Sequence, residues 1–161
     1  MDGTLYKTYY NSPCGLLEIC GNEKGITSLY FVNKRSGTEK KNKHIVDCLT
    51  QLDAYFNKKR KSFSLPLDLE GTDFQKRVWN ELLKIPFGKT ISYLELAKNL
   101  GDAKCIRAAG TANGKNPVSI IVPCHRVIGS NGDLIGYGGG LNKKKWLLEF
   151  EGVLTQKELF V

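Results

Sequence analysis

The chain has 161 residues, of which 41% are hydrophobic and 25% charged, and it carries a formal net charge of +8. These proportions are ordinary for a globular protein, and no apolar run approaches the length of a membrane span. The first residues contain neither a basic leader nor an apolar signal core, so we expect a cytoplasmic protein without membrane contact. The excess of basic residues suits a polyanionic partner.

The first 64 residues predict a small sheet covered by one helix. Short strands are expected at 6–10, 16–20 and 26–32, because turn-forming residues separate these runs. A helix is expected from about His44 to Asn57, since apolar residues recur there at helical spacing: Val46, Leu49, Leu52, Tyr55 and Phe56. A linker at residues 65–67 follows, which places the domain boundary after Ser64.

The cysteines do not indicate a disulfide framework or a metal site. Their number, five, is odd, and a cytoplasmic chain seldom carries structural disulfides. His44 and Cys48 could bind a metal ion from one helical face, but no second pair completes a set of four ligands. We therefore expect neither a metal nor an organic cofactor.

Residues 65–161 are expected to be mainly helical. Thr72 is a candidate N-cap, and Gln75 occupies the capping-box position before an apolar stripe. A second helix is expected over 93–100, opened by Ser92, and a third from about residue 103 to residue 113. Two short helices joined by a tight, glycine-containing turn predict a helix-turn-helix.

The third of these helices is rich in small residues, namely Ala108, Ala109, Gly110, Ala112 and Gly114. A helix that reads the major groove usually carries long polar side chains, whereas a small-residue face lets the backbone approach a narrow groove closely. Tight packing in the core is the alternative explanation. Arg107 is a long cation that would otherwise be out of place inside this helix, and a simple phosphate contact is one of two explanations for it.

The motif Pro123–Val127 (PCHRV) carries the strongest chemical signal. Cys124 ends an apolar run, and His125 and Arg126 follow it directly. The thiolate is the nucleophilic form of cysteine, and a neighbouring base or cation favours it. The alternative is a buried structural cysteine that precedes a surface histidine.

The flank of this motif, residues 116–129 (NPVSIIVPCHRVIG), closely resembles the active-site signature of the O6-alkylguanine-DNA alkyltransferases. Further similarities occur in the same order at 74–75, 78–79, 85–88, 90, 92–93, 96–97, 107–110, 136–137 and 146–152. The resemblance covers about residues 65–154, and residues 1–64 match only loosely. It implies an α+β protein: a three-stranded sheet-plus-helix domain (RNase H-like, 1–64) and a mainly helical winged helix-turn-helix domain (65–161).

The resemblance implies a direct-reversal repair protein, which transfers the alkyl group of O6-alkylguanine irreversibly to Cys124. It leaves O4-alkylthymine open as a second substrate. The implied partner is double-stranded DNA, bound mainly through its minor groove with the damaged nucleotide flipped out. The resemblance further implies a monomer that needs no cofactor and acts at the nucleoid. Some relatives bind zinc in the first domain, but the positions here near Asn22 and Thr27 are not ligand types.

The resemblance also assigns roles to individual residues. Cys124 is the nucleophile, His125 takes its proton through a water, Glu151 orients the imidazole, and Tyr93 helps to extrude the nucleotide and donates a proton to guanine N3. DNA contacts are expected from Arg107, Ala108, Ala109, Gly110, Thr111, Asn113 and Arg126, and the resemblance implies that Arg107 fills the gap left by the flipped base. The pocket is expected to involve Asn116, Val127, Tyr137 and Gly138. Some relatives have serine at the position of Gly138, which leaves the substrate range open.

Three other functions remain in view. A non-catalytic lesion-binding relative usually has tryptophan in place of the nucleophile, so Cys124 argues against it. A winged-helix regulator would use Cys124 structurally or as a sensor of alkylation. A cysteine hydrolase would need an oxyanion hole and a route to turnover, and the flanks match no such signature.

Overall fold

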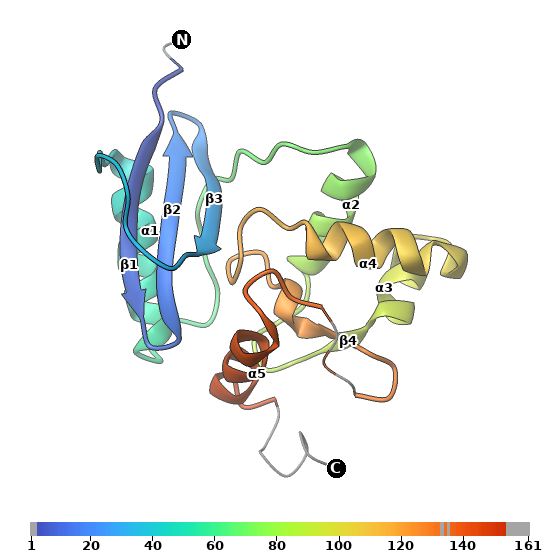
Figure 1. Ribbon diagram of the computed structural model, residues 1–161. Helices are drawn as coiled ribbons and strands as arrows, with labels where there is room; N and C mark the ends of the chain where they lie inside the picture. Colours follow the sequence, from blue (N-terminus) through green and yellow to red (C-terminus); the bar gives the residue numbers. More distant parts are fainter. Residues whose placement is uncertain (1–2, 133, 135, 154–161) are drawn as a thin grey trace. The chain divides into compact units, whose positions relative to one another are not determined.

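The computed structural model describes residues 3–132, 134 and 136–153. The chain divides into two compact units, Met1–Glu70 and Gly71–Val161 (Figure 1). The predicted boundary lies after residue 64, whereas the observed division follows residue 70. Residues 65–70 belong to the first unit because they run beside a strand: the N–H of Ile26 donates to Pro66 O and the N–H of Asp68 donates to Ile26 O, both at 2.9 Å.

The first unit contains the predicted sheet and helix. Strands β1 (Tyr6–Ser12), β2 (Gly15–Asn22) and β3 (Gly25–Phe31) are antiparallel in the order β1-β2-β3. Helix α1 (Lys43–Phe56) packs against all three strands (Figure 1). The predicted sheet-plus-helix architecture is therefore confirmed.

The buried face of α1 is formed by Ile45, Cys48, Leu52, Tyr55 and Phe56. The predicted stripe was wrong at its start, because Val46 is 48% exposed and the neighbouring Ile45 points inward instead. Cys48 lies in the core, where burial raises the pKa of its thiol to about 12. The ring of His44 lies 3.1 Å from Glu23 O. His44 and Cys48 therefore lie in different surroundings: the His44 ring is next to a backbone carbonyl, and the Cys48 thiol is in the core.

The second unit is mainly helical. Its elements are α2 (Asp73–Leu82), β4 (Ile91–Ser92), α3 (Tyr93–Asn99), η1 (Ala103–Cys105), α4 (Ile106–Gly114), η2 (Cys124–Arg126), β5 (Val127–Ile128) and α5 (Leu141–Phe150). The predicted capping box at Thr72 and Gln75 is confirmed, and Ser92 forms a second one with Glu95. Among the described residues, no helix has the length and apolar character needed to cross a membrane.

The two helices of the predicted helix-turn-helix are α3 and α4, which pack against each other and against α2 (Figure 1). The predicted third helix begins as the 3-10 turn η1, which Asp102 caps, before α4 starts at Ile106. Strands β4 and β5 pair in parallel, with Ser92 opposite Ile128. This pairing brings the start of α3, at Tyr93, next to the segment that follows the PCHRV motif.

Candidate active site

The segment before Cys124 is held in shape by Asn116. Its side chain accepts a hydrogen bond from the N–H of Val118 at 2.9 Å and donates to Val122 O at 2.7 Å. Ile120, between them, has a φ of 72°, which is rare for a β-branched residue. From α4, Asn113 Nδ2 donates to Cys124 O at 3.4 Å. The turn that carries the candidate nucleophile is therefore fixed on both sides.

The thiol of Cys124 is buried, with 5% of the residue exposed. Burial raises its pKa to about 11, and a hydrogen bond from Asn116 and the charge of Lys144 partly oppose this rise. The adjoining His125 and Arg126 were expected to favour the thiolate, but both face Glu151 instead. Burial therefore favours the thiol form of Cys124, so a reaction that uses the thiolate needs an acceptor for this proton.

The two residues that follow Cys124 in the chain, His125 and Arg126, belong to a buried cluster with Glu151. His125 Nε2 is 2.9 Å from Glu151 Oε2. Arg126 donates from Nε to Glu151 Oε1 at 2.8 Å and from Nη2 to Oε2 at 2.9 Å, and its Nη1 donates to Ile85 O at 2.7 Å. The predicted pairing of His125 with Glu151 is thus present in the geometry, although 26 residues separate the two in sequence.

The charges of this cluster follow from its surroundings. Burial by itself would raise the pKa of Glu151, but hydrogen bonds from His125 and Arg126 outweigh it and lower the pKa to about 2. Burial lowers the pKa of His125, against the opposing effect of Glu151. Because a carboxylate can only accept, we assign the imidazole proton to Nε2. His125 Nδ1, which has no protein partner, is then a free acceptor.

Lys144 is a functional candidate that the sequence analysis missed. Its side chain is fully buried, its Nζ donates to Gly136 O at 3.2 Å, and it lies 5.7 Å from the centre of the Tyr93 ring. Burial lowers its pKa to about 8, while Cys124 acts in the opposite direction. Lys144 looked like part of an ordinary lysine run. Its spacing from Leu147, Leu148 and Glu151 on one helical face was the available signal.

We expect Lys144→Met to slow reaction of the Cys124 thiol with a small alkylating agent by about tenfold at neutral pH, because the nearby charge that favours the thiolate is lost. Folding should not suffer, since the buried ammonium itself is costly. Lys143→Met is the matched control, because Lys143 is only half-buried on the same helix. Equal rates for the two variants would show that Lys144 does not influence the reactivity of Cys124.

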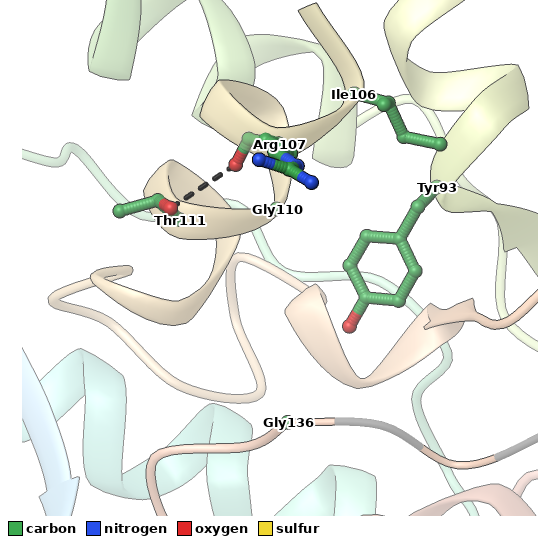
Figure 2. A pocket seen from close by; sticks show the side chains of 6 residues that line it. All are labelled: Tyr93, Ile106, Arg107, Gly110, Thr111 and Gly136. Atoms are coloured by element: carbon green, nitrogen blue, oxygen red, sulfur yellow. Dashed lines mark hydrogen bonds between the residues drawn. The ribbon is translucent and has the colours of Figure 1, made fainter.

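Tyr93 borders a cavity of about 560 Å³ lined by Tyr93, Ile106, Arg107, Gly110, Thr111 and Gly136. Figure 2 shows the Tyr93 ring projecting from α3 toward the loop that carries Gly136, with α4 alongside. A Cβ added at Gly110 would lie 3.6 Å from the ring, so α4 and Tyr93 are in close contact. Burial, and then the charge of Cys124, raise the pKa of the Tyr93 hydroxyl.

The residues on α4 that were expected to contact DNA fall into an exposed group and a buried group. Arg107, Ala108 and Thr111 are exposed on α4, and Gly110 is half-buried beside them. Ala109 and Asn113 face the interior, with 0% and 3% exposed, so their side chains are not available to DNA. The expectation for these two was wrong because they fall on the helical face that packs against the core.

The expected DNA contact of Arg126 was also wrong. Only 6% of the residue is exposed, and all three guanidinium nitrogens donate hydrogen bonds to Glu151 or to Ile85 O. A buried guanidinium engaged in this way cannot reach a phosphate.

The remaining pocket residues lie on the segments that follow the nucleophile. Val127 is buried at the start of β5, and Tyr137 is half-buried in the loop before α5. Gly138 is exposed, and a Cβ added there would meet no atom within 4 Å. A serine would therefore fit at Gly138 without displacing its neighbours.

Together the fold and the site define a class: a helix-turn-helix protein with a buried cysteine directly before a histidine that pairs with a carboxylate. Two family profiles match the chain. The profile described as the ribonuclease-like domain of 6-O-methylguanine DNA methyltransferase covers residues 5–69, and the one described as its DNA binding domain covers residues 73–153.

Known proteins are similar to the chain over nearly its whole length. The methylated-DNA–protein-cysteine methyltransferase of Mycobacterium leprae is 48% identical over 157 residues, which cover 93% of this chain and 95% of the relative. The crystal structure of the Mycobacterium tuberculosis O6-methylguanine methyltransferase superposes with a TM-score of 0.84 and 42% identity, covering 95% and 96% of the two chains. The crystal structure of the M. tuberculosis protein in complex with DNA superposes with a TM-score of 0.83 and 46% identity. The match covers 91% of this chain and 92% of that chain. The chain belongs to the 6-O-methylguanine DNA methyltransferase family.

Proposed function

We propose that this protein repairs O6-alkylguanine in DNA by moving the alkyl group onto its own Cys124. The observation that carries the proposal is the buried Cys124 and, directly after it in the chain, His125, whose Nε2 is paired with Glu151 and whose Nδ1 has no protein partner. Such an arrangement supplies a nucleophile and an acceptor for its proton without any cofactor. Family membership supports the same reaction.

In the proposed reaction the Cys124 sulfur attacks the alkyl carbon, forms a carbon–sulfur bond and breaks the bond between carbon and guanine O6. The thiol proton passes through a water to His125 Nδ1. Tyr93 donates a proton to guanine N3 as the leaving group gains charge. The proton held by His125 is then released to solvent and Tyr93 takes one up, so the net transfer is from the Cys124 thiol to guanine. The thioether is stable, so each protein molecule acts once.

We further propose that α4 enters the minor groove of duplex DNA with its exposed face, which carries Arg107, Ala108 and Thr111. The damaged nucleotide leaves the stack and enters the cavity beside Tyr93, and Arg107 fills the gap that it leaves. Small side chains on that face favour a close approach of the backbone. The protein is proposed to act as a monomer at the nucleoid.

We expect Arg107→Ala to slow repair of O6-methylguanine in a duplex by about tenfold, because the extruded nucleotide loses its replacement in the stack. The reaction with free O6-benzylguanine should change little, since no base has to be flipped. Lys98→Ala, which removes an exposed cation from α3, is the control for charge alone. An equal loss with both substrates would argue against a role in flipping.

The proposed function is tested by mixing the protein with a duplex that contains one O6-methylguanine and measuring the guanine restored. Transfer that stops at one methyl group per protein molecule supports the proposal. Tight and selective binding without restored guanine would place the protein among lesion-binding relatives, and continued turnover would indicate a different chemistry.

A further inference from the structure

The contacts of Arg126 suggest a role in the reaction rather than in DNA binding. Its guanidinium donates hydrogen bonds to both carboxylate oxygens of Glu151 through Nε and Nη2, and Nη1 donates to Ile85 O. The ring of Phe87 lies 5.9 Å away. A paired fork of this kind fixes the plane of a carboxylate as well as its charge. Glu151 Oε2 is therefore shared between Arg126 and His125.

The net charge of the buried cluster depends on the protonation of His125. With a neutral imidazole, the charges of Arg126 and Glu151 cancel. With an imidazolium, the cluster carries a net positive charge, and the buried Lys144 adds a second cation nearby. An unbalanced charge in the interior is costly, so the neutral imidazole is favoured.

The charged groups that act on His125 in the described part of the chain are Lys144 on α5, Glu151 at the C-cap of α5, and Arg126 on the same turn as His125. Burial lowers the pKa of His125, Glu151 raises it, and Arg126 and Lys144 lower it. Arg126 thus opposes the carboxylate, which would otherwise turn the imidazole into its ion-pair partner.

We propose that Arg126 is a positioning residue for alkyl transfer: by neutralising Glu151 it keeps His125 uncharged, with the proton on Nε2 and the Nδ1 lone pair open to the proton of Cys124. An imidazolium has no lone pair and cannot take that proton. Arg126, two residues after Cys124, therefore acts by keeping His125 able to accept a proton. The inference rests on the proposed alkyl transfer, but the protonation state of His125 can be measured without it.

The first test reads His125 directly by ¹⁵N NMR. The chain has two histidines, so His44→Gln leaves His125 as the single imidazole. We expect the neutral form protonated at Nε2 at neutral pH and at pH values below the ordinary pKa of 6.5. An imidazolium at pH 7, or a proton on Nδ1, would overturn the inference whether or not the protein transfers alkyl groups.

The second test compares Arg126→Met with Arg126→Lys in the same single-histidine background. Arg126→Met should leave His125 charged at neutral pH and slow transfer from free O6-benzylguanine by about tenfold at pH 7, with recovery at higher pH. Arg126→Lys keeps the charge but not the fork, so it should restore most of the rate at pH 7.

A purely structural role predicts a different outcome, namely equal losses for the two variants and an unchanged pH profile. That result would overturn the inference. If Arg126→Met does not fold, the pH profile of Arg126→Lys and the NMR titration of the His44→Gln protein still test the proposed role of Arg126. The affinity for undamaged duplex should be the same in Arg126→Lys as in the wild type, because the side chain is buried.

Discussion

Cys124→Ser is expected to abolish alkyl transfer, with a loss on the order of 10³-fold or more, while the affinity for DNA stays unchanged. A serine hydroxyl is far less nucleophilic than sulfur, and His125 alone is too weak a base to ionise it at neutral pH. The substitution is nearly isosteric, so the buried turn and its contact with Asn113 should persist. The measurement is the rate at which guanine is restored in a duplex containing O6-methylguanine.

Cys14→Ser is the matched control for Cys124→Ser. Cys14 lies in the first unit between β1 and β2 and is only partly buried, so its substitution should leave transfer intact. Retained transfer in Cys124→Ser would exclude Cys124 as the acceptor. Loss of DNA affinity in the same variant would show that the substitution disturbs more than the chemistry.

Glu151→Gln should have the second largest effect, because it removes the one carboxylate of a buried cluster. Arg126 would then be a buried charge without a counter-charge, which costs about 3 kcal/mol of stability. An amide has one acceptor oxygen where Arg126 and His125 together use two, so the proton of His125 is no longer fixed on Nε2 and we expect transfer to slow on the order of 100-fold. Chemical denaturation and single-turnover kinetics measure the two effects separately.

The pH dependence gives Glu151→Gln a sharper test. The pKa of Glu151 is about 2 in the folded protein and 4.5 ordinarily. A depressed carboxyl pKa stabilises the fold above 4.5, and this contribution is lost as the pH falls toward 2. The stability difference between wild type and variant should therefore shrink over that window. Glu149→Gln, at an exposed site on α5, should show neither the instability nor the slow transfer.

Much of the fold could be predicted because its signals are local. The capping box at Thr72 and Gln75 uses residues within one helical turn, and the strands of the first unit are separated by turn-forming residues. The helix-turn-helix followed from two short helices and the turn between them. The first buried residue of α1 was predicted wrongly, since Ile45 and Val46 are both apolar and only packing decides which one is buried.

The site was harder to predict because its contacts are long-range. The resemblance paired His125 with Glu151, but nothing local shows that Arg126 turns toward the same carboxylate. That direction is set where α5 packs against η2. Lys144 was missed because its neighbours are lysines too, and only its place on the buried face of α5 separates it from them.

The most direct test of the account is the intact mass of the protein after incubation with a duplex containing one O6-methylguanine, followed by peptide mapping. We expect a single added methyl group, located on Cys124, in step with the appearance of unmodified guanine. A methyl group on another residue, or guanine restored with no change in protein mass, would contradict it.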